Sequence, residues 1–553
     1  MEPTRLALEL QVRKTRGAFF TPPELTNFIA HWAIRTADDR VLEPSCGEAA
    51  FLLPAAFRLR NLGSPTDLRE QLTGIDIHSE STEHARNLLV SNGATPIVHT
   101  CDFFSFRSNS DKYDVVIGNP PYVRYQSFSG EARIRALEAA LRQGVRLNGL
   151  ASSWAAFTIH AASFLKPNGR LGLVLPAELL SVNYAAQVRR YLLNRFKSVR
   201  LVLFESLVFP GVLEEVVLLL AEGQGGAHSF EVFQAKDLDD LSRISKGDWT
   251  GYNPQDGDKW TSALLPGDSL QMYREITHGN DFEILLDWGD TYLGAVTGNN
   301  NFFALSHTTA RKLGLHSGEL VRISPPGSRH LRGLSFTDAA WNKLLNADEP
   351  CLLFYPKDNL SAAATRYIYS GEKDKVHDAY KCAARTPWWR VPMVSKSDLI
   401  FTYMNHDGPR LTSNKAGIHL LNSLYGVKLK PSRVKLGRDL LPILSLNSIT
   451  LLGAEVVGRS YGGGMLKHEP READALPIPS FEIIKSCARK LRLLQPQIAA
   501  ALRRSDLTPA TDIVDRVLLH ESLGISMKKI EALRQARDLL FQRRMSRSKG
   551  QRG

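Results

Sequence analysis

The stretch Asp114-Val-Val-Ile-Gly-Asn-Pro-Pro-Tyr122 decides the fold class of this 553-residue chain. Residues 114–117 form a short, largely apolar run that is typical of a buried parallel strand. The run must end at the prolines, because proline cannot donate a hydrogen bond to a sheet ladder. The sequence therefore places Asn119 and Tyr122 at the carboxyl end of a strand, the edge where open α/β sheets bind ligands.

The four residues Asn119, Pro120, Pro121 and Tyr122 carry a candidate chemistry. The Asn119 side-chain oxygen and the Pro120 carbonyl are two acceptors that suit the hydrogens of one planar NH2 group. Tyr122 could stack on the ring that carries this group. A strand with a simple proline turn is the alternative, which the full combination of four residues disfavours. The segment resembles the signature of amino-methyltransferases that use S-adenosylmethionine.

Composition predicts an ordinary globular protein, with 43% hydrophobic and 23% charged residues. The length favours roughly two to four domains. We expect no membrane span and no signal peptide, and the five scattered cysteines indicate a cytoplasmic protein without a structural metal. The net charge of +12 favours a polyanionic partner. The basic residues 543–552 are expected to form a disordered arm.

The segment Gly17-Ala-Phe-Phe-Thr-Pro-Pro23 precedes a predicted helix over 25–34, with Thr21 as its N-cap. A capped helix without further function is one interpretation. The segment also resembles the one that, in adenine-N6 DNA methyltransferases, holds the methionine end of the cofactor. That resemblance implies that Phe20, Thr21 and Pro22 surround the cofactor.

Residues 41–47, Val-Leu-Glu-Pro-Ser-Cys-Gly, followed by a helical run to residue 59, predict the first strand, turn and helix of a doubly wound sheet. They resemble the family's cofactor loop, Asp/Glu-Pro-x-Cys-Gly-x-Gly-x-Phe. The matching residues are Glu43, Pro44, Cys46, Gly47 and Phe51. Glu43 is expected to receive the cofactor's amino group, and Cys46 to serve the turn. Ala49 replaces the second glycine, which is costly if its φ is positive.

Two further strands, over 73–77 and 96–103, end in acidic residues. Asp76, followed by Ile77, has the place of the usual acceptor for ribose hydroxyls, although a strand-end aspartate can be a simple polar cap. Asp102 matches the aspartate that binds the cofactor's adenine amino group in the family. The resemblance implies that Phe103 flanks the adenine, and a place in the core is the alternative.

Strands predicted over 170–175, 199–204 and 215–220 complete a set of seven. The set resembles the Rossmann-like methyltransferase sheet, whose seventh strand inserts antiparallel beside the sixth. In the adenine-N6 enzymes the connection between these strands supplies an aromatic that stacks on an extruded base, and Phe209 matches it. A core position for Phe209 is the alternative. The basic stretch 123–150 is expected to lie near the active site and touch phosphates.

The glycine-rich segment 222–228 suggests a domain boundary. We predict a catalytic domain over 1–225, a mixed α+β DNA target-recognition domain over 226–480, and a helical region with a basic tail over 481–553. Clusters of aromatic, basic and asparagine residues, such as 385–390 and 458–467, support the second assignment. In the latter cluster, Gly462–Gly464 would let backbone N–H groups approach an anion.

The order of these motifs resembles the gamma class of adenine-N6 DNA methyltransferases, usually partners of restriction endonucleases. It implies methyl transfer from S-adenosylmethionine to the N6 amino group of an adenine flipped out of duplex DNA. Asn119, which also contacts the cofactor, would act with Pro120, Pro121 and Tyr122, and Tyr122 and Phe209 would stack on the base, without a metal. The alternatives are a methyltransferase for RNA or protein glutamine, and a catalytically weak DNA-binding relative.

Overall fold

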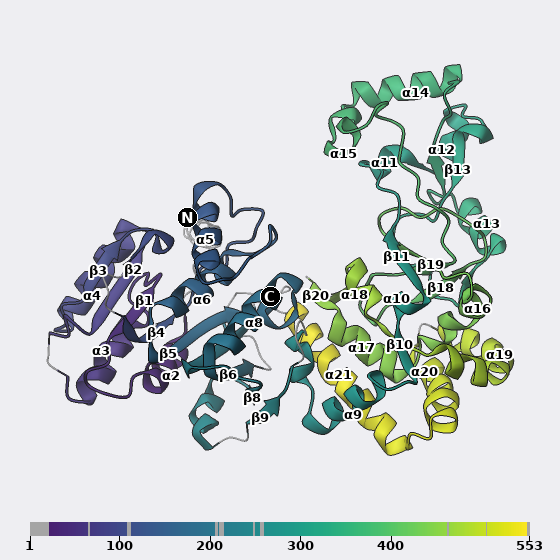
Figure 1. The fold of residues 1–553 in the computed structure, drawn as a ribbon. Helices are drawn as coiled ribbons and strands as arrows, with labels where there is room; N and C mark the ends of the chain where they lie inside the picture. Colours follow the sequence, from purple (N-terminus) through teal and green to yellow (C-terminus); the bar gives the residue numbers. More distant parts are fainter. Residues whose placement is uncertain are drawn as a thin grey trace. The chain divides into compact units, whose positions relative to one another are not determined.

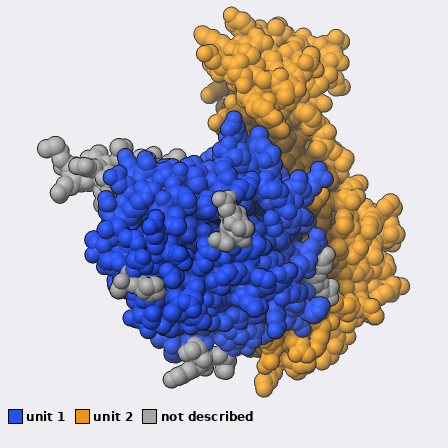
Figure 2. Space-filling model, turned by 60° about the vertical axis from the view of Figure 1, so that its left-hand side comes forward, with its two compact units in different colours: residues 1–264, 546–553 blue, residues 265–545 orange. Residues whose placement is uncertain are grey.

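The computed structural model describes residues 21–549 except 65–66, 108–111, 205–207, 210–214, 247–248, 255–258, 462–463 and 505. The chain forms two compact units, Met1–Leu264 with Ser546–Gly553, and Leu265–Met545 (Figure 2). These units differ in their bounds from the three domains expected at 1–225, 226–480 and 481–553. The functional division of the chain stays a prediction.

A nine-stranded sheet dominates the described part of the first unit, in the order β3-β2-β1-β4-β5-β7-β6-β8-β9 (Figure 1). Its strands are β1 Val41–Pro44, β2 Leu72–Asp76, β3 Ile97–Thr100, β4 Tyr113–Gly118, β5 Leu165–Pro176, β6 Phe196–Phe204, β7 Val216–Gln224, β8 Phe230–Ala235 and β9 Thr250–Tyr252. The strands β3, β2, β1, β4 and β5 are parallel, and β7 is antiparallel to both β5 and β6. The predicted Rossmann-like order is confirmed, and β8 and β9 extend it beyond the expected seven strands.

The helices of this unit are α2 Pro23–Ala33, α3 Leu52–Asn61, α4 Ser79–Ser91, α5 Gly130–Arg142, α6 Ser153–Ser163, α7 Glu178–Ser181 and α8 Ala186–Arg195. Apolar residues at helical spacing, such as Leu25 and Ile29 of α2, are fully buried in the core. Gly74 lets α3 approach β2, because a Cβ there would lie 2.8 Å from the Leu52 side chain. The N-cap of α2 is Pro22, so the prediction that Thr21 caps this helix is wrong. Pro22 takes the N-cap position and Pro23 the first helical position, since the fixed φ of proline suits the start of a helix.

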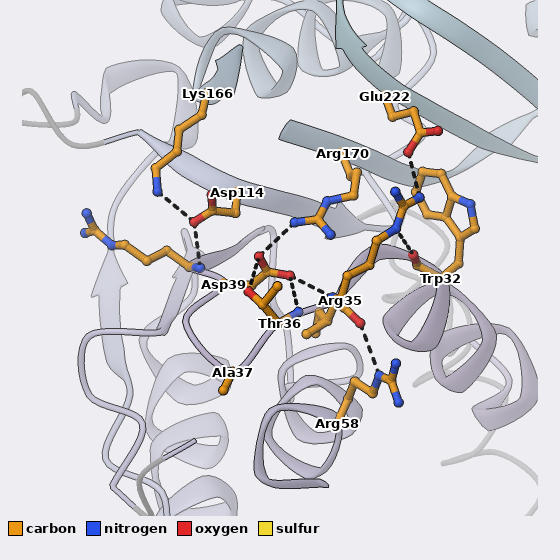
Figure 3. A network of polar contacts seen from close by, with 12 residues as sticks. Trp32, Arg35, Thr36, Ala37, Asp39, Arg58, Asp114, Lys166, Arg170 and Glu222 are labelled. Carbon is orange, nitrogen blue, oxygen red and sulfur yellow. Dashed lines mark hydrogen bonds and ion pairs between the residues drawn. The ribbon is translucent and has the colours of Figure 1, made fainter. Parts of the chain in front are cut away.

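Ion pairs link neighbouring strands of the sheet near their amino-terminal ends (Figure 3). Asp39, which precedes β1, accepts hydrogen bonds from the Arg35 backbone N–H at 2.7 Å and the Arg170 guanidinium of β5 at 2.8 Å. Asp114 of β4 accepts one from Lys166 of β5 at 2.8 Å. Burial raises the pKa of Asp39, but these donors together hold it below its usual value. This network fastens three neighbouring strands to one another.

The second unit is a mixture of small sheets and helices. Its strands are β10 Phe282–Ile284, β11 Gly289–Leu293, β12 Ala304–Leu305, β13 Leu320–Arg322, β14 Ser335–Phe336, β15 Leu352–Phe354, β16 Leu399–Phe401, β17 Met404–Asn405, β18 Leu411–Asn414, β19 Tyr425–Leu429, β20 Arg459–Tyr461, β21 Met465–Lys467 and β22 Pro477–Pro479. The largest sheet has the order β11-β19-β16-β18-β14. This unit is therefore of the expected α+β type.

The helices of the second unit are α9 Gly267–Thr277, α10 Leu285–Trp288, α11 Asn300–Phe303, α12 His307–Lys312, α13 Asp338–Asn346, α14 Ala362–Lys373, α15 Tyr380–Ala383, α16 Val434–Leu444, α17 Ser448–Val457, α18 Pro470–Asp474, α19 Phe481–Arg503, α20 Thr508–Asp515 and α21 Met527–Lys549. Among the described residues no single helix is long and apolar enough to cross a membrane. The pair α16 and α17 reaches that length and composition only together, with a bend of 86°.

The basic tail is largely helical. Arg543 and Arg544 of α21 are buried, and the Arg544 guanidinium bonds both carboxylate oxygens of Glu455, one of them at 2.7 Å. The prediction of a disordered arm is wrong as far as Lys549, because buried pairing of this kind orders the helix end. Residues 550–552 of that arm, and Gly462 and Gly463 of the expected anion-binding turn, lie outside the described residues.

Candidate active site

A cavity of about 370 Å³ lies at the carboxyl ends of β1, β2, β3 and β4. It brings together eleven of the residues selected from the sequence, which are Thr21, Glu43, Cys46, Gly47, Phe51, Asp76, Ile77, Asp102, Phe103, Asn119 and Pro121. They converge because the ends of parallel strands share one edge of a sheet. The cavity has the size of a small-molecule site.

The loop after β1 is held in an unusual backbone conformation. Ser45, Gly47 and Ala49 have φ values of 63°, 50° and 69°, in the left-handed region. The Gly47 N–H donates to the Asp76 carboxylate at 2.9 Å, which ties this loop to the end of β2. Because φ is positive at Ala49, the alanine in place of the second glycine destabilises this loop conformation, by about 1–2 kcal/mol for a residue with a Cβ.

Glu43 lies at the end of β1 with its carboxylate buried beneath the start of α3. It accepts hydrogen bonds from the Leu52 N–H at 2.8 Å and the Phe51 N–H at 3.3 Å. Burial raises the pKa of Glu43 well above its usual value, and the two N–H donors only partly oppose this. The chain thus keeps a buried carboxyl group in the wall of the cavity, ready to become charged beside a cation.

Two aspartates end β2 and follow β3. Asp76 accepts from the His78 N–H at 2.9 Å, and the neighbouring Ile77 is 61% exposed at the cavity. Asp102 accepts from the Phe104 N–H at 3.0 Å and forms an ion pair with Arg135 of α5 at 2.8 Å. Both carboxylates line the cavity, where they can accept hydrogen bonds from hydroxyl or amino groups.

Phe103 is buried in an aromatic cluster behind this wall. Its ring centroid lies 4.7 Å from Phe157 and 4.6 Å from His160, both of α6. The His160 Nε2 contacts the Phe103 carbonyl at 3.1 Å. Burial lowers the pKa of His160 to about 4, so the ring is neutral at pH 7 and donates this hydrogen bond. Phe103 therefore belongs to the core and to the cavity wall at the same time.

The turn after β4 is clamped on both sides. The Asn119 Nδ2 donates to the Thr21 hydroxyl at 3.1 Å, and the Ser153 hydroxyl donates to the Pro121 carbonyl. The Asn119 Oδ1 is buried and has no hydrogen-bond partner among the described residues. A buried acceptor without a donor costs about 1–3 kcal/mol, so an N–H group that reached this atom would be bound favourably.

The expected stacking residues lie outside the cavity wall. The Tyr122 hydroxyl donates to the Val174 carbonyl of β5 at 2.9 Å, and its ring packs against the hydrophobic core. Phe209 is 3% exposed in the same core cluster. Stacking by either ring on a base stays a prediction. Of the other predicted residues, Pro22, Pro44 and Pro120 are adjacent to lining residues, and Phe20 lies outside the described part of the chain.

Several lining residues were not selected from the sequence. They are Ser45, Glu48, His78, Phe128, Ala132, Val123, Ser153 and Phe157, among others. Phe128 and Ala132 come from the stretch 123–150, which was expected near the active site, but no motif in that stretch marks these two residues. Ser153 and Phe157 stand on α6, where every residue from Ser153 to Ala162 is buried and no amphipathic pattern marks the cavity side.

Two family descriptions match this chain. Residues 8–232 match N-6 DNA Methylase, and residues 257–519 match the C-terminal domain of Type II methyltransferase M.Eco57I. Both halves of the chain are thus matched by parts of DNA methyltransferases.

Curated relatives extend over most of the chain. Type II methyltransferase M.AccI of Acinetobacter calcoaceticus is 22% identical over 84% of this chain and 86% of its own length. M.XamI of Xanthomonas campestris pv. amaranthicola is 24% identical over 84% of this chain and 85% of its own length. The solved Type IIL restriction-modification enzyme MmeI in complex with DNA has the same fold, with a TM-score of 0.58, 11% identity, and coverage of 94% of this chain and 75% of MmeI. The first half of the chain thus matches the N-6 DNA Methylase family, and the chain as a whole is similar to DNA methyltransferases of Type II restriction-modification systems.

Proposed function

We propose that this protein transfers a methyl group from S-adenosylmethionine to the N6 amino group of adenine at one short sequence in duplex DNA. The observation that carries the proposal is Asn119 at the end of β4, whose buried Oδ1 has no donor among the described residues, in the wall of a cavity of about 370 Å³. A purine amino group supplies the missing donor.

The cavity's side chains fit the cofactor. Asp76 would accept from the ribose hydroxyls, Asp102 from the adenine amino group, and Glu43 from the ammonium group, with Ile77 against the adenine ring. Thr21 and Pro22 would enclose the methionine end. When bound, S-adenosylmethionine supplies a methyl group on a positively charged sulfur.

Asn119 and Pro120 would act on the target amine. Adenine's amino nitrogen is a poor nucleophile, because its lone pair is delocalised into the ring. Two acceptors that bind its hydrogens favour a tetrahedral nitrogen and stabilise the positive charge that develops there. The clamp formed by Thr21 and Ser153 keeps Asn119 and Pro121 in place, so positioning contributes as well.

The target base must leave the duplex, which costs a few kcal/mol. Stacking of the base on Tyr122 and Phe209 would offset this cost. To stack on the base, Phe209 must leave the core position that it has here. The net charge of +12 supports double-stranded DNA as the partner. We place the enzyme in the cytoplasm, as the modification partner of a restriction endonuclease.

A catalytically weak DNA-binding relative is the second candidate, favoured by one observation. Ala49 has a positive φ in the loop that would hold the cofactor, so a loop that relaxed this strain would lose the conformation proposed to bind it. A titration with S-adenosylmethionine distinguishes the two, because the weak relative would bind it only in the millimolar range or not at all.

The direct test offers methyl-labelled S-adenosylmethionine with duplex DNA, RNA and a glutamine-containing release-factor protein in parallel. We expect label in DNA alone, as N6-methyladenine at one motif, and none with Asn119→Ala. Label in RNA or protein instead, or equal label with the variant, would overturn the proposal.

A further inference from the structure

The basic stretch 123–150 was expected to contact phosphates. Arg135 of helix α5, which belongs to this stretch, is instead paired with carboxylates of the protein. Its Nε lies 2.8 Å from the Asp102 carboxylate, and its Nη1 lies 3.1 Å from Glu131 on the same helix. The side chain of Asp102 is 18% exposed and that of Arg135 38% exposed. The pair is thus partly shielded from water, at the base end of the proposed cofactor site.

The stretch that carries Arg135 also forms part of the cavity wall. Phe128 and Ala132 line the cavity together with Asp102. Arg135 therefore links this wall to the turn Phe103–Ser105 that follows β3. His160 fixes the same turn from the core side through the Phe103 carbonyl.

We propose that Arg135 is a positioning residue that makes Asp102 select a cofactor whose base carries an amino group. The inference rests on the proposed function and names the residue that sets its cofactor specificity. Asp102 receives one donor on each oxygen, the Phe104 N–H on Oδ1 and the Arg135 guanidinium on Oδ2. Two donors fix the plane of the carboxylate, and its remaining lone pairs can only accept.

An amino group donates to such a carboxylate, whereas a keto oxygen at the same place brings two acceptors together. A site built around a fixed acceptor rejects the wrong group strongly, because a buried polar atom is left without a partner. Without Arg135 the carboxylate can rotate, and the discrimination falls. A mere loss of packing by α5 would instead weaken the two kinds of cofactor equally.

The test measures binding without turnover. The dissociation constants of S-adenosylhomocysteine and of its deaminated analogue, S-inosylhomocysteine, are determined by calorimetry for the full chain. The variants are Arg135→Ala, Arg135→Lys and, as a matched control near the end of the same helix, the exposed Arg142→Ala. Thermal unfolding checks that each variant is folded, and Arg135→Lys keeps the charge should Arg135→Ala fail to fold.

We expect the unchanged protein and Arg142→Ala to prefer the adenine compound by at least about tenfold. Arg135→Ala should reduce that preference about fivefold, mainly by weakening adenine binding, and Arg135→Lys should lie between. An unchanged preference in both Arg135 variants, or an equal loss for both compounds, overturns the inference and leaves the proposed function standing. Failure of the unchanged protein to bind S-adenosylhomocysteine overturns both.

Discussion

Polar side chains at the two ends of the strands in the first unit's sheet differ in how many hydrogen-bond partners they have. At the amino-terminal edge, Asp39 collects donors from Arg35, Thr36 and Arg170, and its pKa is lowered (Figure 3). At the carboxyl edge, Glu43 is buried with a raised pKa, and the Asn119 Oδ1 lacks a partner among the described residues. The paired groups stabilise the fold, whereas the buried carboxyl of Glu43, whose two N–H donors only partly oppose the effect of burial, and the Asn119 Oδ1 cost stability, which agrees with the proposed ligand site.

The largest effect is expected at the amino-terminal edge, for Asp39→Ala. The side chains of Asp39 and Arg170 are 6% and 9% exposed. Removal of the Asp39 carboxylate therefore leaves the buried Arg170 guanidinium without its charged partner. Loss of one partner of such a pair costs about 3–5 kcal/mol. Hydrogen exchange of peptides covering β1 and β5 should rise accordingly, whereas the exposed neighbour Asp38→Ala should leave it unchanged.

The same pair predicts a dependence on pH. The folded pKa of Asp39 lies below its ordinary value of 3.8, so its contribution is complete above that value and is lost as the pH falls through the folded pKa. The difference between the natural protein and Asp39→Ala should therefore shrink below about pH 4. A difference that stays constant to lower pH would contradict the assignment.

At the carboxyl edge, Asn119→Ala should abolish function with little effect on stability. Methyl transfer should fall about 100- to 1000-fold, the size seen when one charge-stabilising hydrogen-bonding group is removed. The free energy of unfolding should change by less than about 1 kcal/mol, because the lost bond to Thr21 is offset by removal of the orphan oxygen. Asn194→Ala, on the exposed side of α8, is the control for both measurements. A destabilised Asn119→Ala would mean that this edge, too, is built for stability.

The protonation of Glu43 gives a second test of the carboxyl-terminal ends of the strands, through the number of protons released when the cofactor binds. Because its folded pKa is raised, the folded protein holds a proton that the unfolded chain gives up, and Glu43 lowers stability as the pH rises above about 4.5. A cofactor ammonium beside it should lower the pKa again, so binding should release protons from Glu43 in the pH range above about 4.5 where the free folded protein still holds them. Calorimetry in buffers of different ionisation enthalpy measures this number. Glu43→Gln should release none, Glu80→Gln should behave like the natural protein, and equal release by all three would exclude Glu43.

The smallest effect is expected for Ala49→Gly. Relief of the positive φ is partly offset by the added freedom of glycine in the unfolded chain and by the lost buried methyl group. The net gain in stability should be at most about 1 kcal/mol, with cofactor binding equal or tighter. Ala50→Gly, at a neighbour without a positive φ, should lose about 1 kcal/mol instead. A loss of the same size in both variants would show that the loop carries no strain at Ala49.

The carboxyl edge was largely predictable from the sequence, because apolar runs followed by Glu43, Asp76, Asp102 and Asn119 fix the strands and their ends. Contacts between segments distant in sequence were not. Neither the Arg135–Asp102 pair nor the buried place of Arg544 has a local signal, since surface-type residues acquire such partners only in the folded chain.

The same limit hid β8 and β9, which follow a glycine-rich segment that resembles a linker. The sign of φ at Ala49 likewise could not be known, because alanine is compatible with either kind of turn until its neighbours fix the backbone.

The position of β8 has a practical consequence for dividing the chain into separate halves. A first half that ends within residues 222–228 would lack β8, which pairs in parallel with β6 from Arg200 to Phe204. The bare backbone of β6 would then recruit other polypeptides and promote aggregation. A junction after Leu264 keeps the sheet whole, and the chain should be divided there.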